Sequence, residues 1–138
     1  HGWFEQERKI LDMGCGTGVL GIMAKKCGAV SVVAVDIDDK SVANTKENAI
    51  ANAVELDVRL DSIPPEGHYD LIMANIHRNI LLAQMPAYAA YLKANGELWL
   101  SGFYEEDVPV LSQVAHECGL CVVETRNTNE WHWIRLNR

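Results

Sequence analysis

Basic side chains are scarce in this sequence. Its 138 residues include 12 Lys or Arg against 19 Asp or Glu, which gives a formal net charge of −7. Proteins that bind nucleic acid unaided usually present a basic face, so this balance argues against direct nucleic-acid binding. Long apolar runs are lacking too, because no stretch approaches the roughly 18 residues that span a membrane. The sequence therefore predicts neither a membrane protein nor a direct nucleic-acid binder.

Cysteine is sparse and does not form a metal-binding pattern. The four cysteines stand at positions 15, 27, 118 and 121. Cys118 and Cys121 have C-x-x-C spacing, but no second pair of Cys or His completes a zinc site, so we expect no metal. We interpret all four as free thiols, and this indicates a reducing compartment and hence a cytoplasmic protein.

The apolar runs alternate between strand-like and helix-like periods. Seven strands are predicted, at 10–13, 31–35, 54–60, 70–74, 97–101, 121–126 and 131–136. Four helices are predicted, at 19–27, about 39–52, 80–92 and 107–118. This order predicts an α/β, Rossmann-like fold with a mostly parallel seven-stranded sheet, helices on both faces and a C-terminal antiparallel hairpin. Such sheets bind ligands at the carboxyl ends of their strands, so the loops after the first four strands should carry the chemistry.

Individual residues predict where some of these helices begin and where the chain turns. Asp38 or Asp39 can cap the second helix, and Pro86 should lie in a first turn or at a kink. Asn95-Gly96 predicts a turn before the fifth strand, and residues 127–129 predict the turn of the hairpin.

The loop after the first strand is rich in glycine. Residues 10–21 read I-L-D-M-G-C-G-T-G-V-L-G, with glycines at 14, 16, 18 and 21. Glycine suits backbone that turns tightly and approaches a ligand closely, and the helix that follows offers free N–H groups. From Gly16 the letters also match G-x-G-x-x-G, so the loop fits either a nicotinamide dinucleotide or S-adenosylmethionine.

Two carboxylates bear on that choice. Asp36 ends the second strand, 20 residues after Gly16, where it can accept hydrogen bonds from ribose hydroxyls or else cap the next helix. Both cofactors contain ribose, so Asp36 does not discriminate. Asp12 lies inside the apolar first strand, where a carboxylate is costly unless it is satisfied. The α-ammonium group of S-adenosylmethionine can satisfy it, although Asp12 can also simply shape the loop.

Two further loops complete the candidate site. Asp61 follows the third strand, where a carboxylate can accept the adenine amino group or simply start a loop. Asn75 follows the fourth strand, and its amide offers both a donor and an acceptor that can orient an amine. An ordinary turn role remains open for Asn75.

These residues resemble a known group of enzymes. Residues 10–18 followed by Val35-Asp36-Ile37-Asp38 resemble the first two motifs of class I S-adenosylmethionine-dependent methyltransferases. The segments 70–76, 79–82 and 96–104, with Glu130-Trp131 in the closing strand, are similar to the ribosomal protein L-eleven (L11) methyltransferase family.

The resemblance implies an N-methyltransferase that acts on lysine side chains and an N-terminal amine of a large-subunit ribosomal stalk protein. Asn75 would face the methyl group and the incoming amine. The residues expected to bind S-adenosylmethionine are Asp12, Gly14, Gly16, Thr17, Gly18, Asp36, Ile37, Asp61 and Asn75.

The sequence departs from that family at its start. Family members carry an N-terminal substrate-recognition domain and a Gly-Thr-Gly-His-type segment before the catalytic core, and His1-Gly2-Trp3-Phe4 does not match it. We therefore expect residues 1–138 to be a single methyltransferase domain, the C-terminal part of a longer protein, which can bind cofactor yet methylate poorly alone.

Three other functions remain open. The first is an NAD-dependent oxidoreductase that uses G-x-G-x-x-G, although Asp12 and the closing hairpin weaken it. The second is a methyltransferase for a nucleic-acid base, another amine or a small molecule. The third is a binding module without catalysis. No His–Asp pair stands out as a general base, and we interpret His77 as a helix-start residue.

Overall fold

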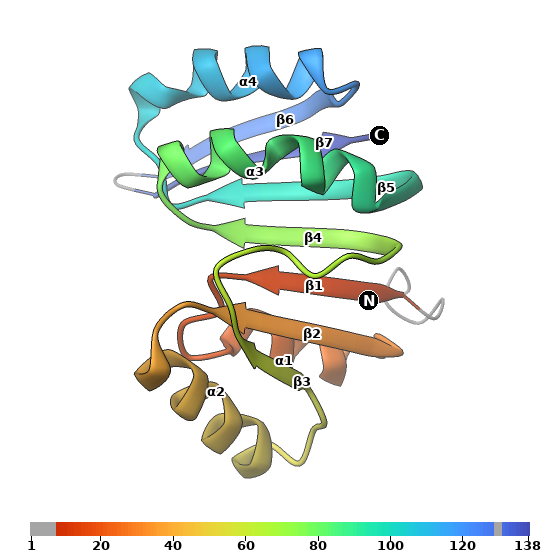
Figure 1. Cartoon of the computed structure of the whole chain (residues 1–138), viewed down its shortest axis with the longest axis vertical. Coiled ribbons are helices and arrows are strands. Elements are labelled where there is room, and N and C mark those ends of the chain that lie inside the picture. The colour runs from red at the N-terminus through yellow and green to blue at the C-terminus, as the bar shows by residue number, and fades with distance from the viewer. Residues whose placement is uncertain (1–7, 129–130) are drawn as a thin grey trace. The chain divides into compact units, whose positions relative to one another are not determined.

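The chain divides into two compact units, residues 1–64 and 65–138. Figure 1 shows them in the computed structural model, which describes residues 8–128 and 131–138. Each unit contains strands flanked by helices, in the alternating order that the sequence predicts. None of the helices in these described ranges is both long and apolar enough to cross a membrane.

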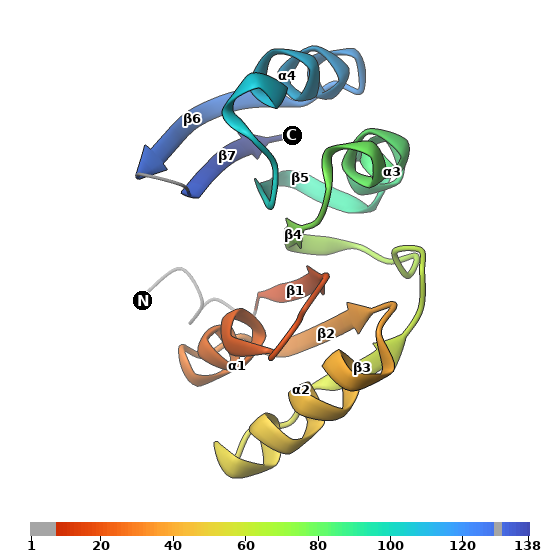
Figure 2. The ribbon, with the colours of Figure 1, turned by 90° about the vertical axis from the view of Figure 1, so that its left-hand side faces the viewer.

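The first unit is a β-α-β-α-β arrangement (Figure 2). Its elements are β1 (Lys9–Met13), α1 (Val19–Lys26), β2 (Ser31–Asp36), α2 (Asp39–Ala51) and β3 (Asp57–Leu60). Strand β2 pairs in parallel with β1 on one side and with β3 on the other. Helix α1 packs on β1 and β2, α2 packs on β2 and β3, and the two helices touch each other. All three carboxyl strand ends therefore meet at one edge of this unit.

Sequence-local chemistry accounts for these elements. Strand β2 reads S-V-V-A-V-D, a β-branched run of the kind that parallel strands bury. Helix α2 is capped by Asp38, whose carboxylate accepts from the backbone N–H of Lys40 at 3.2 Å and from the hydroxyl of Ser41. The predicted cap of α2 is thus confirmed at Asp38.

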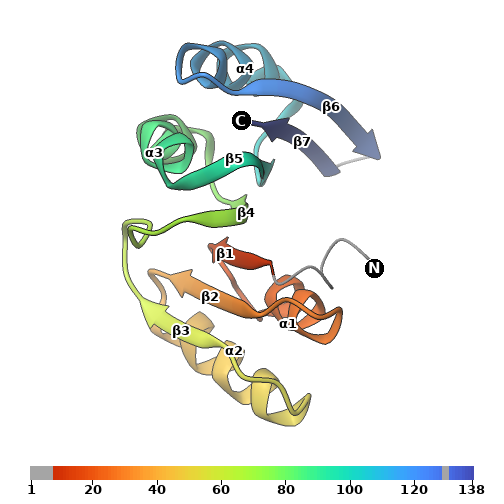
Figure 3. The ribbon, with the colours of Figure 1, turned by 90° about the vertical axis from the view of Figure 1, so that its right-hand side faces the viewer.

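The second unit continues the alternation and closes with a hairpin (Figure 3). Its elements are β4 (Tyr69–Asn75), α3 (Arg78–Tyr91), β5 (Leu92–Ser101), the short 3-10 helix η2 (Glu105–Asp107), α4 (Val108–Glu117), β6 (Cys121–Thr128) and β7 (Trp131–Asn137). Strands β4 and β5 are parallel, whereas β7 is antiparallel to both β5 and β6. The predicted antiparallel hairpin is confirmed.

Several predicted boundaries are wrong. Strand β5 begins at Leu92 and runs through Asn95, which adopts a φ of 66°, so Asn95-Gly96 is an irregularity within the strand rather than a turn before it. Pro86 lies in the interior of α3, so its predicted place in a first turn is wrong and the predicted kink stays a prediction. Strand β6 extends through Asn127 and Thr128, since pairing with β7 outweighs the turn preference of these residues; Asn129 of the predicted turn and Glu130 lie outside the described residues.

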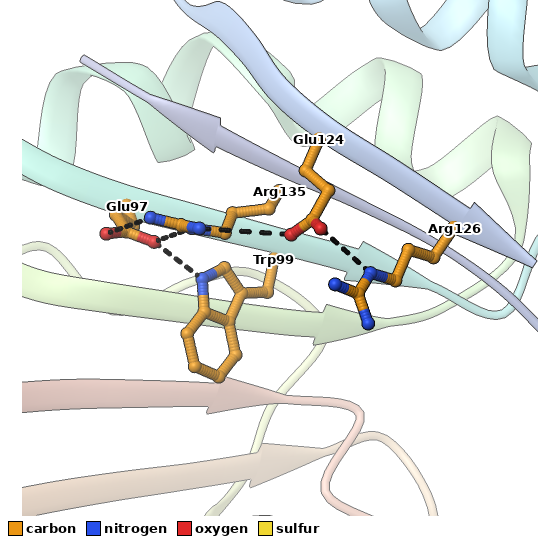
Figure 4. A network of polar contacts seen from close by, with 5 residues as sticks. All are labelled: Glu97, Trp99, Glu124, Arg126 and Arg135. Carbon is orange, nitrogen blue, oxygen red and sulfur yellow. Dashed lines mark hydrogen bonds and ion pairs between the residues drawn. The ribbon is translucent and has the colours of Figure 1, made fainter. Parts of the chain in front are cut away.

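A polar network crosses three strands of the second unit (Figure 4). The Glu97 carboxylate on β5 accepts from the Arg135 guanidinium of β7 at 2.6 Å and from the Trp99 indole N–H at 2.9 Å. Arg135 also lies 3.9 Å from Glu124 of β6, which in turn pairs with Arg126 at 2.8 Å. Glu97 is the most buried charged member, with a side chain 16 % exposed, so it should contribute most to stability.

Replacing Glu97 therefore tests how far this network stabilises the second unit. Glu97→Gln should lower the free energy of unfolding by about 1 kcal/mol, because one carboxylate serves both Arg135 and Trp99. Glu124→Gln is the matched control and should cost less, since its partner Arg126 is 63 % exposed. Urea denaturation at low and high salt measures both, and equal losses in the two variants contradict the assignment.

Candidate functional site

The glycine loop between β1 and α1 is fixed to the end of β2. The backbone N–H groups of Gly14 and Cys15 both donate to the carbonyl of Val35, at 2.8 and 3.1 Å. Within the loop, Gly18 N–H donates to Cys15 O at 2.8 Å. Gly14, Gly16 and Gly18 have φ angles of 75°, 57° and 83°, the left-handed region that glycine adopts without strain.

The glycines of this loop serve different purposes. A Cβ on Gly16 would meet nothing within 4 Å, so that residue leaves an open approach to the backbone. A Cβ on Gly18 would lie 2.7 Å from the methyl carbon of Thr45 on α2, which makes Gly18 a packing requirement. At Gly21, inside α1, the space for a Cβ is bounded at 3.3 Å by both Asp12 and Val32. Of these three, Gly16 alone has the open space that suits a closely approaching ligand.

Asp36 joins the second strand to the glycine loop. Its Oδ2 accepts from Gly16 N–H at 2.9 Å, and its Oδ1 accepts from Asp38 N–H at 3.1 Å. Each carboxylate oxygen keeps further acceptor capacity, so Asp36 can also receive ribose hydroxyls. Its neighbour Ile37 is 67 % exposed and offers an apolar surface on which a flat ring can pack.

Asp12 is a buried carboxyl in the first strand of the first unit. Only 2 % of the residue is exposed, and its Oδ2 finds no hydrogen-bond partner among residues 8–128 and 131–138. Burial raises the pKa of this carboxyl to about 7, a hydrogen bond from the Gly21 backbone opposes the shift, and the charge of Asp36 adds to it. A buried acceptor without a partner, next to a loop open at Gly16, fits the ammonium group of an amino-acid ligand.

Asp61 and Thr17 also lie at this edge of the first unit. The N–H of Asp61 donates to the carbonyl of Asp36 at 3.0 Å. This bond places Asp61 beside Asp36, the candidate residue for binding ribose. Its Oδ1 accepts from the N–H groups of Ser62 and Ile63, so Asp61 does start a turn, and the same exposed carboxylate is available to a ligand. Thr17 is exposed at the tip of the loop. The structure thus brings Asp12, the glycines, Asp36, Ile37 and Asp61 to one strand edge.

Asn75 belongs to the second unit and is exposed at the end of β4. The Ser101 hydroxyl donates to Asn75 Oδ1 at 3.3 Å, and Ile76 N–H donates to the Ser101 carbonyl at 3.1 Å. Gly102 has a φ of 87°, and a Cβ there would lie 2.7 Å from Asn75 Oδ1. The step Ser101-Gly102 therefore sets the orientation of the Asn75 amide. His77 is exposed and begins α3, as interpreted from the sequence.

Sequence reasoning missed two residues of this region, Thr45 and Asn48 on α2. Both donate to carbonyls of the glycine loop. A signal existed for Thr45, since it lies on the buried stripe of α2 between Val42 and Ala49 and is the polar member of that stripe. Among the described residues, no group of three His, Cys, Asp or Glu side chains is placed to hold a metal ion.

Comparisons with known proteins agree with this geometry. Residues 2–138 match the family described as ribosomal protein L11 methyltransferase (PrmA). The chain belongs to this family. Relatives named ribosomal protein L11 methyltransferase include one from Porphyromonas gingivalis, 50 % identical over 132 residues, and one from Phocaeicola vulgatus, 43 % identical over 133 residues. These alignments cover 93 and 94 % of this chain but 46 and 47 % of the relatives, so the chain spans about half of their length.

A solved structure extends the comparison to the fold. The crystal structure of a ribosomal protein L11 methylase from Lactobacillus delbrueckii subsp. bulgaricus is 31 % identical and matches with a TM-score of 0.91. The match covers 96 % of this chain and 71 % of that one. The predicted α/β, Rossmann-like fold with seven strands and a closing antiparallel hairpin is confirmed. Family membership gives no support to the NAD-dependent alternative.

The charge state of Asp12 can be tested without ligand. The pKa of Asp12 is about 7 in the folded chain against 3.8 for an ordinary Asp, so the folded state holds an extra proton between these values. The free energy of unfolding should therefore fall as pH rises through that window, by up to about 1.4 kcal/mol per pH unit from this group. Asp12→Asn should lack this component. Urea titrations from pH 4 to 8 measure it, and parallel pH profiles for both proteins contradict it.

Proposed function

We propose that this chain is the cofactor-binding and catalytic part of an enzyme that moves a methyl group from S-adenosylmethionine to amino groups of ribosomal protein L11. The observation that carries the proposal is the buried Asp12 carboxylate, whose Oδ2 lacks a partner in the described part of the chain. A ligand with an ammonium group supplies that partner, and a nicotinamide dinucleotide has no such group. Family membership supports the same choice.

The residues of the first unit have distinct binding roles. Asp12 receives the α-ammonium group, either directly or through water. Asp36 accepts the ribose hydroxyls while it holds Gly16, and Asp61 accepts the adenine amino group beside exposed Ile37. The backbone of Gly14, Gly16, Thr17 and Gly18 forms the wall over which the ligand lies. When bound, S-adenosylmethionine supplies an electrophilic methyl group on a sulfonium centre.

Asn75 orients the nucleophile. The Ser101 hydroxyl occupies part of the acceptor capacity of Asn75 Oδ1, and the remaining lone pair can accept an N–H from the incoming amine. The amine attacks in line when it is neutral, so a lysine must first lose a proton, since its ordinary pKa is about 10.4. The protein contributes mainly by holding nucleophile and methyl group in line and by excluding water.

Family membership supports a ribosomal protein as the substrate. We propose lysine side chains and the N-terminal amine of the large-subunit stalk protein L11 as acceptors, with no direct contact to nucleic acid. We also propose a cytoplasmic location, and that residues 1–138 form one methyltransferase domain whose partner recognition needs a further domain. A methyltransferase for another amine, a base or a small molecule is the alternative that the assay below separates.

The direct test is a transfer assay. The full-length protein, of which this chain is proposed to be the catalytic part, is incubated with methyl-labelled S-adenosylmethionine and ribosomal proteins from cells that lack L11 methylation. Label should enter the L11 band, and Asn75→Ala should slow transfer at least tenfold while cofactor binding, measured by calorimetry, changes less. Label in RNA or a small molecule selects the alternative, and binding of NAD in place of S-adenosylmethionine overturns the proposal.

Asp36 provides a binding test with a matched control. Asp36→Ala should weaken S-adenosylmethionine binding at least tenfold, roughly 1.4 kcal/mol, because it removes the ribose acceptor and the bond to Gly16. Asp38→Ala removes the cap of α2 and should cost about 1 kcal/mol of stability without changing the dissociation constant. Calorimetric titration and thermal melts measure both, and unchanged affinity in Asp36→Ala refutes the ribose assignment.

A further inference from the structure

Helix α2 holds the glycine loop through two side chains that lie three residues apart. The hydroxyl of Thr45 donates to the carbonyl of Gly16 at 2.9 Å, and the amide of Asn48 donates to the carbonyl of Thr17 at 2.8 Å. Residues at i and i+3 share one face of a helix, so a single face of α2 supplies both donors. Consecutive carbonyls at the tip of the loop are thereby bound from one side.

Thr45 is fully buried and takes part in a chain of hydrogen bonds. Its single hydroxyl proton goes to Gly16 O, so the contact of 3.4 Å with the Cys15 sulfur has the thiol as donor. Burial raises the pKa of Cys15 to about 11, which keeps that thiol protonated at neutral pH. The bonds therefore run from Cys15 to Thr45 and on to Gly16, and they orient the hydroxyl in one direction.

The methyl group of Thr45 fits against Gly18. A Cβ at Gly18 would lie 2.7 Å from this methyl carbon and 3.1 Å from the hydroxyl oxygen. The absent side chain of Gly18 is thus what lets Thr45 reach the loop. Thr45 contacts Cys15, Gly16 and Gly18, and Asn48 adds Thr17, so α2 touches every residue of the tip.

Peptide geometry gives this arrangement a consequence for binding. In a trans peptide the carbonyl of one residue and the N–H of the next point in opposite directions. Because the Gly16 carbonyl points to Thr45, the N–H of Thr17 points away from α2. If the peptide between Gly16 and Thr17 were free to rotate, the Gly16 carbonyl could face the ligand side instead of the Thr17 N–H. A carbonyl in that place would repel the carboxylate of S-adenosylmethionine.

We propose that Thr45 and Asn48 are positioning residues for S-adenosylmethionine binding. Neither touches the ligand; both fix the Gly16-Thr17-Gly18 backbone so that it is ordered before the ligand arrives. Preorganisation of this kind raises affinity by removing the entropic cost of ordering the loop on binding. This inference rests on the proposed function for its ligand, but the ordering of the loop stands without it.

The test separates the hydroxyl from the packing of the side chain. Thr45→Val keeps the shape and removes the donor, whereas Thr45→Ser keeps the donor and removes the methyl group. Thr45→Val should weaken S-adenosylmethionine binding about tenfold, the order expected for one lost buried hydrogen bond, and Thr45→Ser should stay within about threefold of wild type. Calorimetry is run at a temperature where melts show every variant folded.

Asn48 has a control on its own helix. Asn48→Ala should weaken binding about threefold to tenfold, as expected for an exposed hydrogen bond. The side-chain amide of Asn52 donates to the carbonyl of Asn48 at the C-terminal end of α2. Because this bond does not involve the glycine loop, Asn52→Ala should leave the dissociation constant unchanged. If Asn52→Ala weakens binding as much as Asn48→Ala does, general stability of α2 explains the effect and the proposal is wrong.

Hydrogen exchange provides a readout that needs no ligand. The Gly16 and Gly18 amides, bonded to Asp36 and to Cys15, should exchange at least fivefold faster in Thr45→Val, while amides in α3 keep their rates. Unchanged loop exchange, or equal affinity loss in Thr45→Val and Thr45→Ser, overturns the proposal. If wild type fails to bind S-adenosylmethionine but loop exchange accelerates as expected, the proposed function fails and the positioning role of Thr45 remains.

Discussion

The carboxyl end of strand β2 is the constraint on which the candidate site depends. The Val35 carbonyl accepts from both Gly14 and Cys15, and the Asp36 carboxylate accepts from Gly16. The backbone carbonyl of Asp36 accepts from the N–H of Asp61 and so fixes the loop that follows β3. Two loops that are far apart in sequence thus take their positions from two adjacent residues. A displacement of this strand end would move the loop backbone, Asp36 as the proposed ribose acceptor and Asp61 as the proposed adenine acceptor together.

Asp12 shows how a proposed binding residue can conflict with stability. Within the described ranges its buried Oδ2 has no partner, and its raised pKa of about 7 reflects the cost of keeping a charge there. A site evolved only for folding would place an apolar residue at this point of β1. A carboxylate at this position is understandable if a cationic group of a ligand lies beside it during function. The ligand then offsets the free energy that the free protein loses by burying the charge of Asp12.

The sequence predicted the fold well, and it singled out several of the residues that the structure brings to one strand edge, for physical reasons. Alternating apolar periods and the run of β2 locate most elements, since they depend on local burial. Strand β5 starts earlier than Asn95-Gly96 suggests because Leu92 already pairs with Tyr69 of β4, and residues 93–96 form the irregularity between that pair and Glu97. Asp12, Asp36 and Gly16 were identifiable because each breaks a local pattern. Thr45 and Asn48 were missed because an ordinary polar residue in a helix acquires its role through a contact about 30 residues away in sequence.

The glycine loop also shows why a glycine pattern alone does not identify a cofactor. Gly18 is required by the methyl group of Thr45, and Gly21 packs against Asp12 and Val32, so both positions serve the protein interior. Of Gly16, Gly18 and Gly21, Gly16 alone has both a positive φ and open space beside its Cα. A dinucleotide site and a methyl-donor site share these packing requirements, and their sequences therefore share the same glycine pattern. What separates the two is the charge placed beside the loop, and here that charge is a buried carboxylate one strand residue before Met13, where β1 ends.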